Sequence, residues 1–438
     1  ASGLIVEGEL NLGGPARSVT IEIRPGSGDP DWDGVAYNPG STGTIDGATI
    51  STAVIALTVD TDLPVTIRNS TITGAVPLEW EDMAGGALVG RGFLGLDGVA
   101  IVNGGSPALH VGAEEPEVDG VAYATLTDSE LAGGGVVVTR RNGMDIYYST
   151  IRDSAVDGDG GGIYLAEEGE IYAFGLELLD NSATRGGGMF MAPDSFAWVE
   201  GHVIGNSATH GGGLYVDDAM LEIYTSTIQG NTATGRGGGL VVENSGYVEA
   251  ADLLVDSNVA GWNGGGALID SADILLNDAK VSNNQALSGG GLASVRDSNV
   301  WLYGAVIDNN VASLYGGGVF NVGSELSIGA SSVIDNQSGS GAGGSIWITA
   351  GALTGNGNIA ANGGPAQLAK GGGGAGGRIA LYTDSGVFHG SLSAHGGEGA
   401  EYGAAGTIYG KLTSDEFGLL LIDNNDQDGA ITPLEDPI

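Results

Sequence analysis

The sequence contains no cysteine among its 438 residues and has few positive charges. The absence of cysteine excludes disulfide bonds, thiol catalysis and cysteine-ligated metal sites. Only 14 lysine and arginine residues stand against 54 aspartate and glutamate residues, giving a formal net charge of −40. Nucleic-acid binding depends on basic side chains that neutralise phosphates, so this composition argues against DNA or RNA as a partner. No run of 18 apolar residues occurs, and we therefore predict no transmembrane helix.

Proline is also scarce, with 12 residues, whereas glycine is abundant, with 83. The glycines follow no three-residue period, which excludes a collagen triple helix. The hydrophobic fraction of 42% is too high for a disordered glycine-rich linker. The glycines must therefore belong to a folded structure with many turns or close backbone contacts.

Two markers repeat along the chain at intervals of 25 to 27 residues. The first is a glycine triplet, and the second is an asparagine preceded three residues earlier by an aliphatic residue. The triplets begin at Gly160, Gly186, Gly211, Gly237, Gly264, Gly289 and Gly316. The asparagines are Asn181, Asn206, Asn231, Asn258, Asn284, Asn310 and Asn336. Two markers that keep step over seven units indicate a repeat architecture.

Within each unit the apolar residues alternate with mixed ones, as at Leu221 and Ile223 or at Ile274 and Leu276. This period of two predicts short β-strands with one buried face. One unit cannot bury that face alone, so successive units must stack with parallel strands about 4.8 Å apart. We therefore predict an all-β parallel β-helix, or solenoid, with coils of about 26 residues. The asparagine column then reads as a structural ladder of side-chain amides, because stacked coils place like residues above one another.

The regularity of the repeat suggests four segments. Residues 1–120 are expected to form an N-terminal cap and irregular coils, and residues 121–345 the regular repeats. Residues 346–422 are expected to form glycine-rich C-terminal coils, and residues 423–438 an acidic tail.

The paired motifs resemble the repeats of the polymorphic outer-membrane proteins and related bacterial β-helix adhesins. Those proteins carry G-G-A-[ILV] and F-x-x-N, where this chain has G-G-G-[ILMVA] and [ILV]-x-x-N over about residues 125–345. Aliphatic residues replace the phenylalanine, so the similarity is to the wider repeat class. The resemblance implies a right-handed helix, export, surface display and adhesion, and it transfers no catalytic residue.

A candidate calcium loop lies in the acidic tail. Asn424, Asp426, Asp428 and Glu435 occupy positions 1, 3, 5 and 12 of the calcium-loop template, and Gly429 occupies position 6. Asn424 replaces the usual aspartate, and no flanking helices are expected because Leu419–Ile422 reads as a strand. Calcium is thus the one cofactor that the sequence suggests. The alternative is a solvated acidic tail or a linker.

The second residue after each triplet forms a column that is rich in aromatic residues. Strand alternation predicts that this column points outward and offers a binding surface. The candidate binding residues are Tyr164, Phe190, Tyr215, Phe320 and Trp347. A covering loop, or a wrong assignment of the faces, is the alternative. A second candidate outward patch comprises Tyr172, Phe174, Tyr224, Trp301 and Tyr303.

These features favour an extracellular or cell-surface structural or adhesive protein without catalytic activity. Its expected partners are copies of itself, joined end to end or by strand donation, or surface glycans and proteins. The start at Ala1-Ser2-Gly3 is consistent with a mature end after export. The alternative is a polysaccharide-binding or polysaccharide-degrading enzyme of lyase or glycosidase type. Asp217-Asp218 is the only Asp-Asp pair, and no histidine or Arg-x-Lys partner lies beside it.

Overall fold

The chain is an all-β parallel β-solenoid with about 12 turns and about 26 residues per turn. The computed structural model describes residues 4–13, 19–21, 34–51, 55–73, 85–102, 107–112, 121–334, 336–338, 345–363, 373–429 and 432, and none of these is helical. Two compact units are present. Unit 1 comprises Ala1–Ala208 and Gly213–Glu222, and unit 2 comprises Thr209–Gly212 and Ile223–Ile438.

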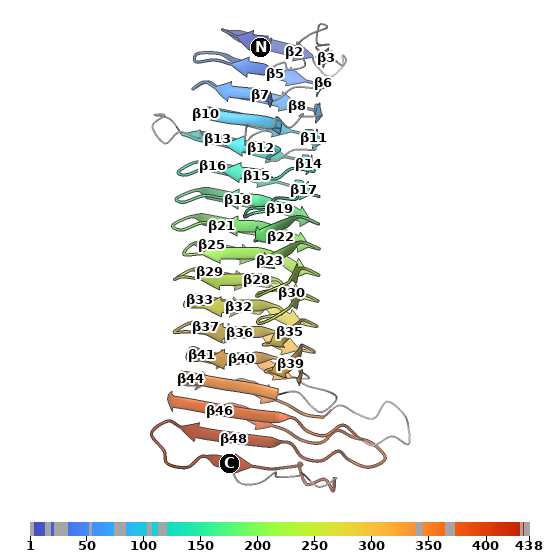
Figure 1. Ribbon diagram of the computed structural model, residues 1–438, viewed down its shortest axis with the longest axis vertical. Helices are drawn as coiled ribbons and strands as arrows, with labels where there is room; N and C mark the ends of the chain where they lie inside the picture. Colours follow the sequence, from blue (N-terminus) through green and yellow to red (C-terminus); the bar gives the residue numbers. More distant parts are fainter. Residues whose placement is uncertain are drawn as a thin grey trace. The chain divides into compact units, whose positions relative to one another are not determined.

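Each regular coil places its strands on three faces and adds one short extra strand (Figure 1). Face A holds the strand that follows the glycine triplet. Face B holds the next strand, and face C the strand that leads to the repeated asparagine. The short strand after the asparagine is called the hook strand, and the hook strands form a separate sheet.

The strands of unit 1 have the following bounds. Face A contains β1 (Leu4–Val6), β4 (Val35–Tyr37), β7 (Ile55–Asp60), the first half of β10 (Gly85–Asp97), β12 (Leu109–Val111), β15 (Val136–Val138), β18 (Ile163–Leu165), β21 (Met189–Met191) and β24 (Leu214–Asp217). Face B contains β2 (Glu9–Gly13), β5 (Thr42–Asp46), β8 (Val65–Arg68), the second half of β10, β13 (Ala122–Thr127), β16 (Gly143–Tyr147), β19 (Glu170–Leu179), β22 (Phe196–Ile204) and β25 (Met220–Tyr224). Face C contains β3 (Val19–Ile21), β6 (Ala48–Ser51), β9 (Thr71–Thr73), β11 (Ala100–Val102), β14 (Glu130–Ala132), β17 (Thr150–Arg152) and the ends of β19 and β22. The hook strands are β20 (Ser182–Arg185) and β23 (Ser207–His210).

The strands of unit 2 follow the same plan. Face A contains β28 (Leu240–Glu243), β32 (Ala267–Asp270), β36 (Leu292–Val295), β40 (Val319–Val322), β44 (Ser345–Gly355), β46 (Arg378–Ser385), β48 (Thr407–Leu412) and β49 (Leu419–Leu421). Face B contains β29 (Tyr247–Ala251), β33 (Asp273–Asn277), β37 (Asn299–Tyr303), β41 (Glu325–Gly329) and the end of β44. Face C contains β26 (Thr227–Gln229), β30 (Leu254–Asp256), β34 (Lys280–Ser282), β38 (Val306–Asp308), β42 (Ser332–Ile334), β45 (Asn358–Ala360) and β47 (Ser391–Ser393). The hook strands are β27 (Thr232–Ala233), β31 (Val259–Ala260), β35 (Gln285–Ser288), β39 (Val311–Tyr315) and β43 (Gln337–Ser338).

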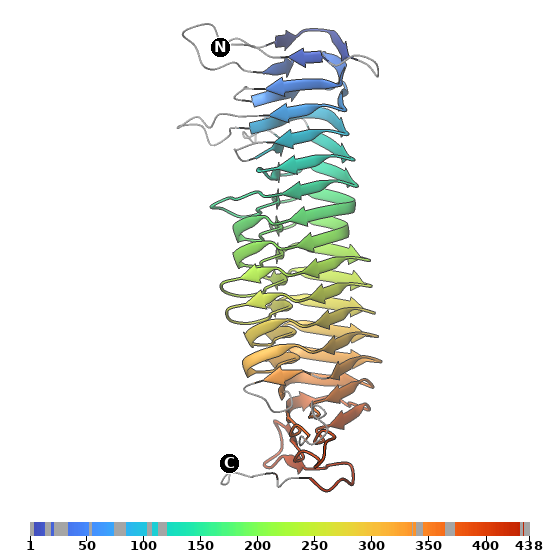
Figure 2. The same cartoon turned by 90° about the vertical axis from the view of Figure 1, so that its right-hand side faces the viewer.

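Successive coils pair in parallel register, so like positions lie above one another. On face B of unit 2, Ile274 of β33 is the partner of Val300 of β37, and Leu276 is the partner of Leu302. All four side chains are buried, whereas the residues between them are partly exposed. The parallel solenoid and its period-two core are therefore confirmed. Figure 2 shows the strands of the unit 2 faces stacked coil upon coil.

The glycine triplets allow neighbouring coils to approach closely at the turn into face A. Gly264 has a φ of 71°, in the left-handed region that favours glycine. A Cβ on Gly265, the next residue, would lie 2.3 Å from the carbonyl oxygen of Gly290 in the following coil. Side chains at these positions would separate the coils, which explains why all three residues of the triplet are glycine.

The repeated asparagines form hydrogen-bonded ladders within each unit. In unit 2 the Asn231 backbone N–H and the Asn231 side-chain amide donate to Oδ1 of Asn258, at 2.9 Å and 3.0 Å. Nδ2 of Asn258 donates in turn to the carbonyl of Ile228 at 2.9 Å. The pattern repeats through Asn284 and Asn310 to Asn336. In unit 1, Asn181 donates to Asn206 in the same way. The amides are buried, and those within the ladder, such as Asn258 and Asn284, bond to the coils before and after them.

Replacing one ladder asparagine should destabilise unit 2. The change Asn258→Ala removes the acceptor shared by the buried Asn231 N–H and the Asn231 side-chain amide, so we expect the free energy of unfolding to fall by roughly 2–5 kcal/mol. Urea denaturation followed by circular dichroism measures the loss. The control is Asn277→Ala, on the outer side of β33 in the same unit, which should change stability by less than about 0.5 kcal/mol. Equal effects of the two changes would contradict a structural role for the ladder.

Candidate functional site

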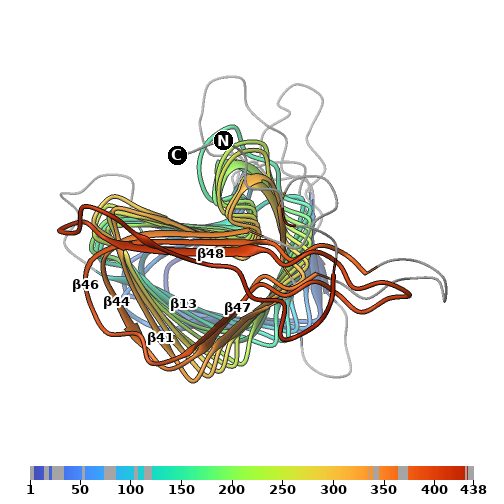
Figure 3. The same ribbon diagram turned by 90° about the horizontal axis from the view of Figure 1, so that it is seen from below.

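The aromatic column after the triplets is covered by the hook strands and is not the exposed row that the sequence predicts. In unit 1, Phe190 is 3% exposed and Tyr215 is 2% exposed, while Tyr164 is partly exposed. In unit 2, Phe320 is partly exposed and stacks on Tyr315 of β39 at 6.2 Å between ring centroids. The side chain of Trp347 lies outside the described part of the chain. Figure 3 shows the hook strands of unit 2, in yellow, lying over the outer side of the sheet that contains β48.

The column does point away from the solenoid core, as predicted, but it packs into a second apolar layer. The rings of Tyr164 and Phe190 stack at 5.6 Å, and those of Phe190 and Tyr215 lie 5.5 Å apart. Arg185, the last residue of hook strand β20, lies over both the Phe190 and Tyr215 rings at 4.5 Å and 5.3 Å. Its guanidinium also pairs with Asp159 at 2.7 Å and Asp217 at 3.3 Å. These contacts fasten the hook to face A.

A related arginine cluster lies at the same turn in unit 2. Arg236, which precedes a glycine triplet, pairs with Glu243 at 3.5 Å and with Asp270 at 3.1 Å. Arg296 also pairs with Asp270, which is buried. Glu243 and Asp270 are register partners, so they form the kind of carboxylate pair that glycosidases use. Each carboxylate forms an ion pair with an arginine, however, so a role in stabilising the turn accounts for both side chains.

Three of the four candidate calcium ligands lie within the described residues, and Asn424 is already engaged in hydrogen bonds within the chain. Oδ1 of Asn424 accepts a hydrogen bond from the Gly396 N–H at 2.6 Å, and its Nδ2 donates to the carbonyls of Gly403 and Gln427, both at 3.2 Å. The amide therefore fastens the tail to the preceding coils. Asp426 and Asp428 are exposed, and Glu435 lies outside the described residues. Within the described ranges, no group of three or more histidine, aspartate or glutamate side chains is placed to hold a metal ion.

Exposed apolar side chains gather around β49 in unit 2. This strand pairs antiparallel with β48, through Leu421 and Ile408, Leu420 and Tyr409, and Leu419 and Gly410. Among the described strands it has no second neighbour. All three leucines are exposed, with Leu419 at 75%, and Phe417 beside them is 78% exposed. We call Phe417 to Ile422 the apolar edge.

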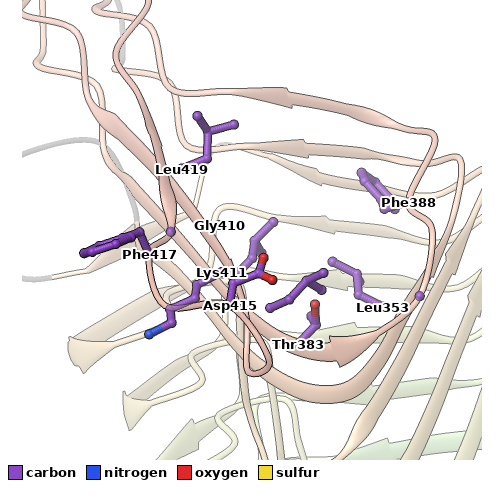
Figure 4. A pocket seen from close by; sticks show the side chains of 12 residues that line it. Leu353, Thr383, Phe388, Gly410, Lys411, Asp415, Phe417 and Leu419 are labelled. Atoms are coloured by element: carbon purple, nitrogen blue, oxygen red, sulfur yellow. The ribbon is translucent and has the colours of Figure 1, made fainter.

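A cavity of about 460 Å³ opens beside the apolar edge. Figure 4 shows Leu353, Thr383 and Phe388 on one side of it and Phe417 on the other, while the Lys411 side chain points away. Leu381, Leu412 and Leu419 complete much of the apolar lining, and Asp415 supplies a carboxylate. The sequence identified Leu419–Ile422 only as a strand. The absence of charged residues from this segment, in a strongly acidic chain, could have indicated a contact surface.

The fold and these surfaces define a parallel β-solenoid protein. No family model matches the chain, and no match is found among curated proteins. In the described ranges there is no helix of the length and apolarity needed to cross a membrane.

His110 is a buried titratable group on face A of unit 1. Its side chain is 7% exposed on β12, and neither ring nitrogen has a hydrogen-bond partner among the described residues. Its register partners are Leu88 and Val137, which are both apolar. Burial disfavours the charged imidazolium and lowers the pKa of His110 below its ordinary value of 6.5.

This pKa shift predicts acid sensitivity. The unfolded chain binds a proton at His110 as the pH falls below about 6.5, whereas the folded chain resists protonation, so the free energy of unfolding decreases in that range. The change His110→Leu removes this contribution. Urea denaturation at pH 8 and pH 5.5 should show a smaller loss of stability for the variant than for the parent chain. Replacement of the exposed His202 by leucine is the control and should preserve the parent's pH dependence.

Proposed function

We propose that this protein is a structural and adhesive module of the cell surface or the extracellular space, and that it associates with a second copy of itself through the apolar edge. The observation that carries the proposal is the exposed, uncharged strand β49. Support for the location comes from the acidic composition and from the resemblance to exported β-helix adhesins.

The backbone geometry of β49 favours a second copy as the partner. An edge strand presents free N–H and C=O groups, and it can pair with the same strand of another molecule across a two-fold axis. Antiparallel pairing is self-complementary, because each copy offers the same residues in opposite directions. Two copies of Leu419–Leu421 would thus continue the sheet from β48 of one molecule to β48 of the other.

The side chains around β49 support the same contact. The apolar edge presents Phe417, and the adjoining cavity of about 460 Å³ has a mainly apolar lining that accepts such a ring. Across a two-fold axis, Phe417 of each copy would enter the cavity of the other. Lys411 and Asp415 flank the surface with opposite charges. Because each chain carries a net charge of −40, association requires an uncharged surface of this kind.

We expect the protein to dimerise reversibly and the change Leu420→Lys to abolish dimerisation. A charge at the centre of the paired strands would lie in a desolvated interface without a partner. Sedimentation velocity over a range of concentrations measures the mass. The matched control is Leu314→Lys, which alters an exposed leucine of hook strand β39 and should leave the dimer intact.

Two results would overturn the proposal. The first is a parent chain that stays monomeric at high concentration. The second is an equal effect of Leu420→Lys and Leu314→Lys, which would show that any added charge prevents association. Circular dichroism melting of each variant establishes that it is folded before its mass is compared.

A further inference from the structure

The outer side of face B in unit 1 carries a dense array of aromatic and acidic side chains. Parallel register aligns five coils there, from the second half of β10 through β13, β16 and β19 to β22. Three outward positions per coil give three columns. The first column is Phe93, Tyr123, Gly143, Glu170 and Phe196; the second is Gly95, Thr125, Asp145, Tyr172 and Trp198; the third is Asp97, Thr127, Tyr147, Phe174 and Glu200. We call these fifteen residues the aromatic grid.

The composition of the grid is unlike that of the rest of the chain. Seven of its fifteen residues are aromatic, whereas aromatic residues make up 6% of the sequence. Four are carboxylates, and none is basic. The same face in unit 2, over β29, β33, β37 and β41, has three aromatic residues at twelve outward positions: Tyr247, Trp301 and Tyr303. The enrichment is therefore a property of one region of face B and does not follow from the repeat.

Glycines beneath the grid let several rings lie against the backbone. A Cβ on Gly143 would lie 2.6 Å from the Tyr123 ring, so that ring occupies the space above this glycine. A Cβ on Gly175 would likewise lie 2.7 Å from the ring of Tyr148, a residue that borders the grid. The Phe93 and Tyr123 rings stack at 6.4 Å with an angle of 12° between their planes. Contact with the sheet and with neighbouring rings restricts the orientation of these side chains.

The rings remain accessible, and polar groups lie among them. Within the grid, Tyr172 is 44% exposed and Tyr147 is 39% exposed, and the other five rings are partly exposed. The Tyr123 hydroxyl donates to Oδ1 of Asp145 at 2.6 Å, which fixes both groups on the surface. The remaining carboxylate oxygens are hydrogen-bond acceptors. A ligand with an apolar face and many hydroxyl donors would satisfy both kinds of group.

We propose that the aromatic grid binds an uncharged glycan chain. The apolar C–H face of each sugar ring would pack on the aromatic rings, and sugar hydroxyls would donate to the carboxylates of Asp145, Glu170 and Glu200. Five coils at a spacing of about 4.8 Å give a platform about 19 Å long, which suits several sugar units of a chain. Anionic polysaccharides are disfavoured, because the grid holds four carboxylates and the adjoining Arg68 is already paired with Asp97 at 3.8 Å. This site is separate from the apolar edge, and its ligand does not depend on association of the chain.

Affinity electrophoresis of the full chain tests the proposal. The probes are three neutral polysaccharides (hydroxyethyl cellulose, mannan and dextran), the anionic polygalacturonate and the cationic oligomers of chitosan. We expect retardation by at least one neutral polysaccharide, unchanged in 0.5 M sodium chloride because no ion pair is involved. The double change Tyr172→Ala and Trp198→Ala should weaken this binding at least tenfold. The matched control, Trp301→Ala with Tyr303→Ala on face B of unit 2, should stay within twofold of the parent chain.

Three results would overturn the proposal: no retardation by any neutral polysaccharide; equal loss of binding in the two double variants; or binding only to chitosan oligomers that salt abolishes, which would identify a cation-binding surface. Circular dichroism melting shows whether each double variant is folded. The Leu420→Lys chain is tested in the same gels. Retention of glycan binding by that variant separates this proposal from the proposed dimer.

Discussion

The buried side-chain amide of the repeated asparagine is the constraint on which the coil structure depends. A buried amide without partners would cost about 1–3 kcal/mol for each unsatisfied group, and the partners of Asn258 lie in the neighbouring coils. Each asparagine therefore fixes the register of the coil before it and of the coil after it. A slip of one residue would break the ladder and also turn the buried face of every strand outward.

The asparagine also sets the point from which the hook strand departs. The first hook residue donates its N–H to the carbonyl of the asparagine one coil earlier, as Val259 does to Asn231 at 2.9 Å. From this fixed point the hook returns over face A and buries its outer side. Arg185 and Arg236 then pair with carboxylates at the end of the face A strands. Where the hook strands cover it, face A thus has apolar layers on both sides, and the aromatic column belongs to the second layer.

The sequence was sufficient for the solenoid, because two markers in step and a period of two determine stacking and core. The prediction that Phe190 and Tyr215 are exposed was wrong, because the alternation of apolar residues does not reveal a strand that covers the outer face. The signal was present in continuous apolar runs after the triplets, such as Met189–Met191, which indicate burial on both faces. Of the aromatic grid, the sequence predicted Tyr172 and Phe174 as part of an outward patch, and both are exposed or partly exposed, but it did not predict the whole array. Its first column runs through Phe93, Tyr123, Gly143, Glu170 and Phe196 at spacings of 30, 20, 27 and 26 residues, so only the strand register aligns it.

The charge of the chain distinguishes the partners of the two proposed surfaces. Two copies at −40 repel one another, although salt at physiological strength screens the repulsion beyond about 8 Å. Contact between copies is therefore favoured where carboxylates are absent, as along residues 417–422. The aromatic grid, with four carboxylates among its rings, would repel another copy of this acidic chain. An uncharged glycan meets no such repulsion and uses the carboxylates as hydrogen-bond acceptors. We therefore expect the same acidic surface to restrict self-association to one region and to leave the grid free for a ligand.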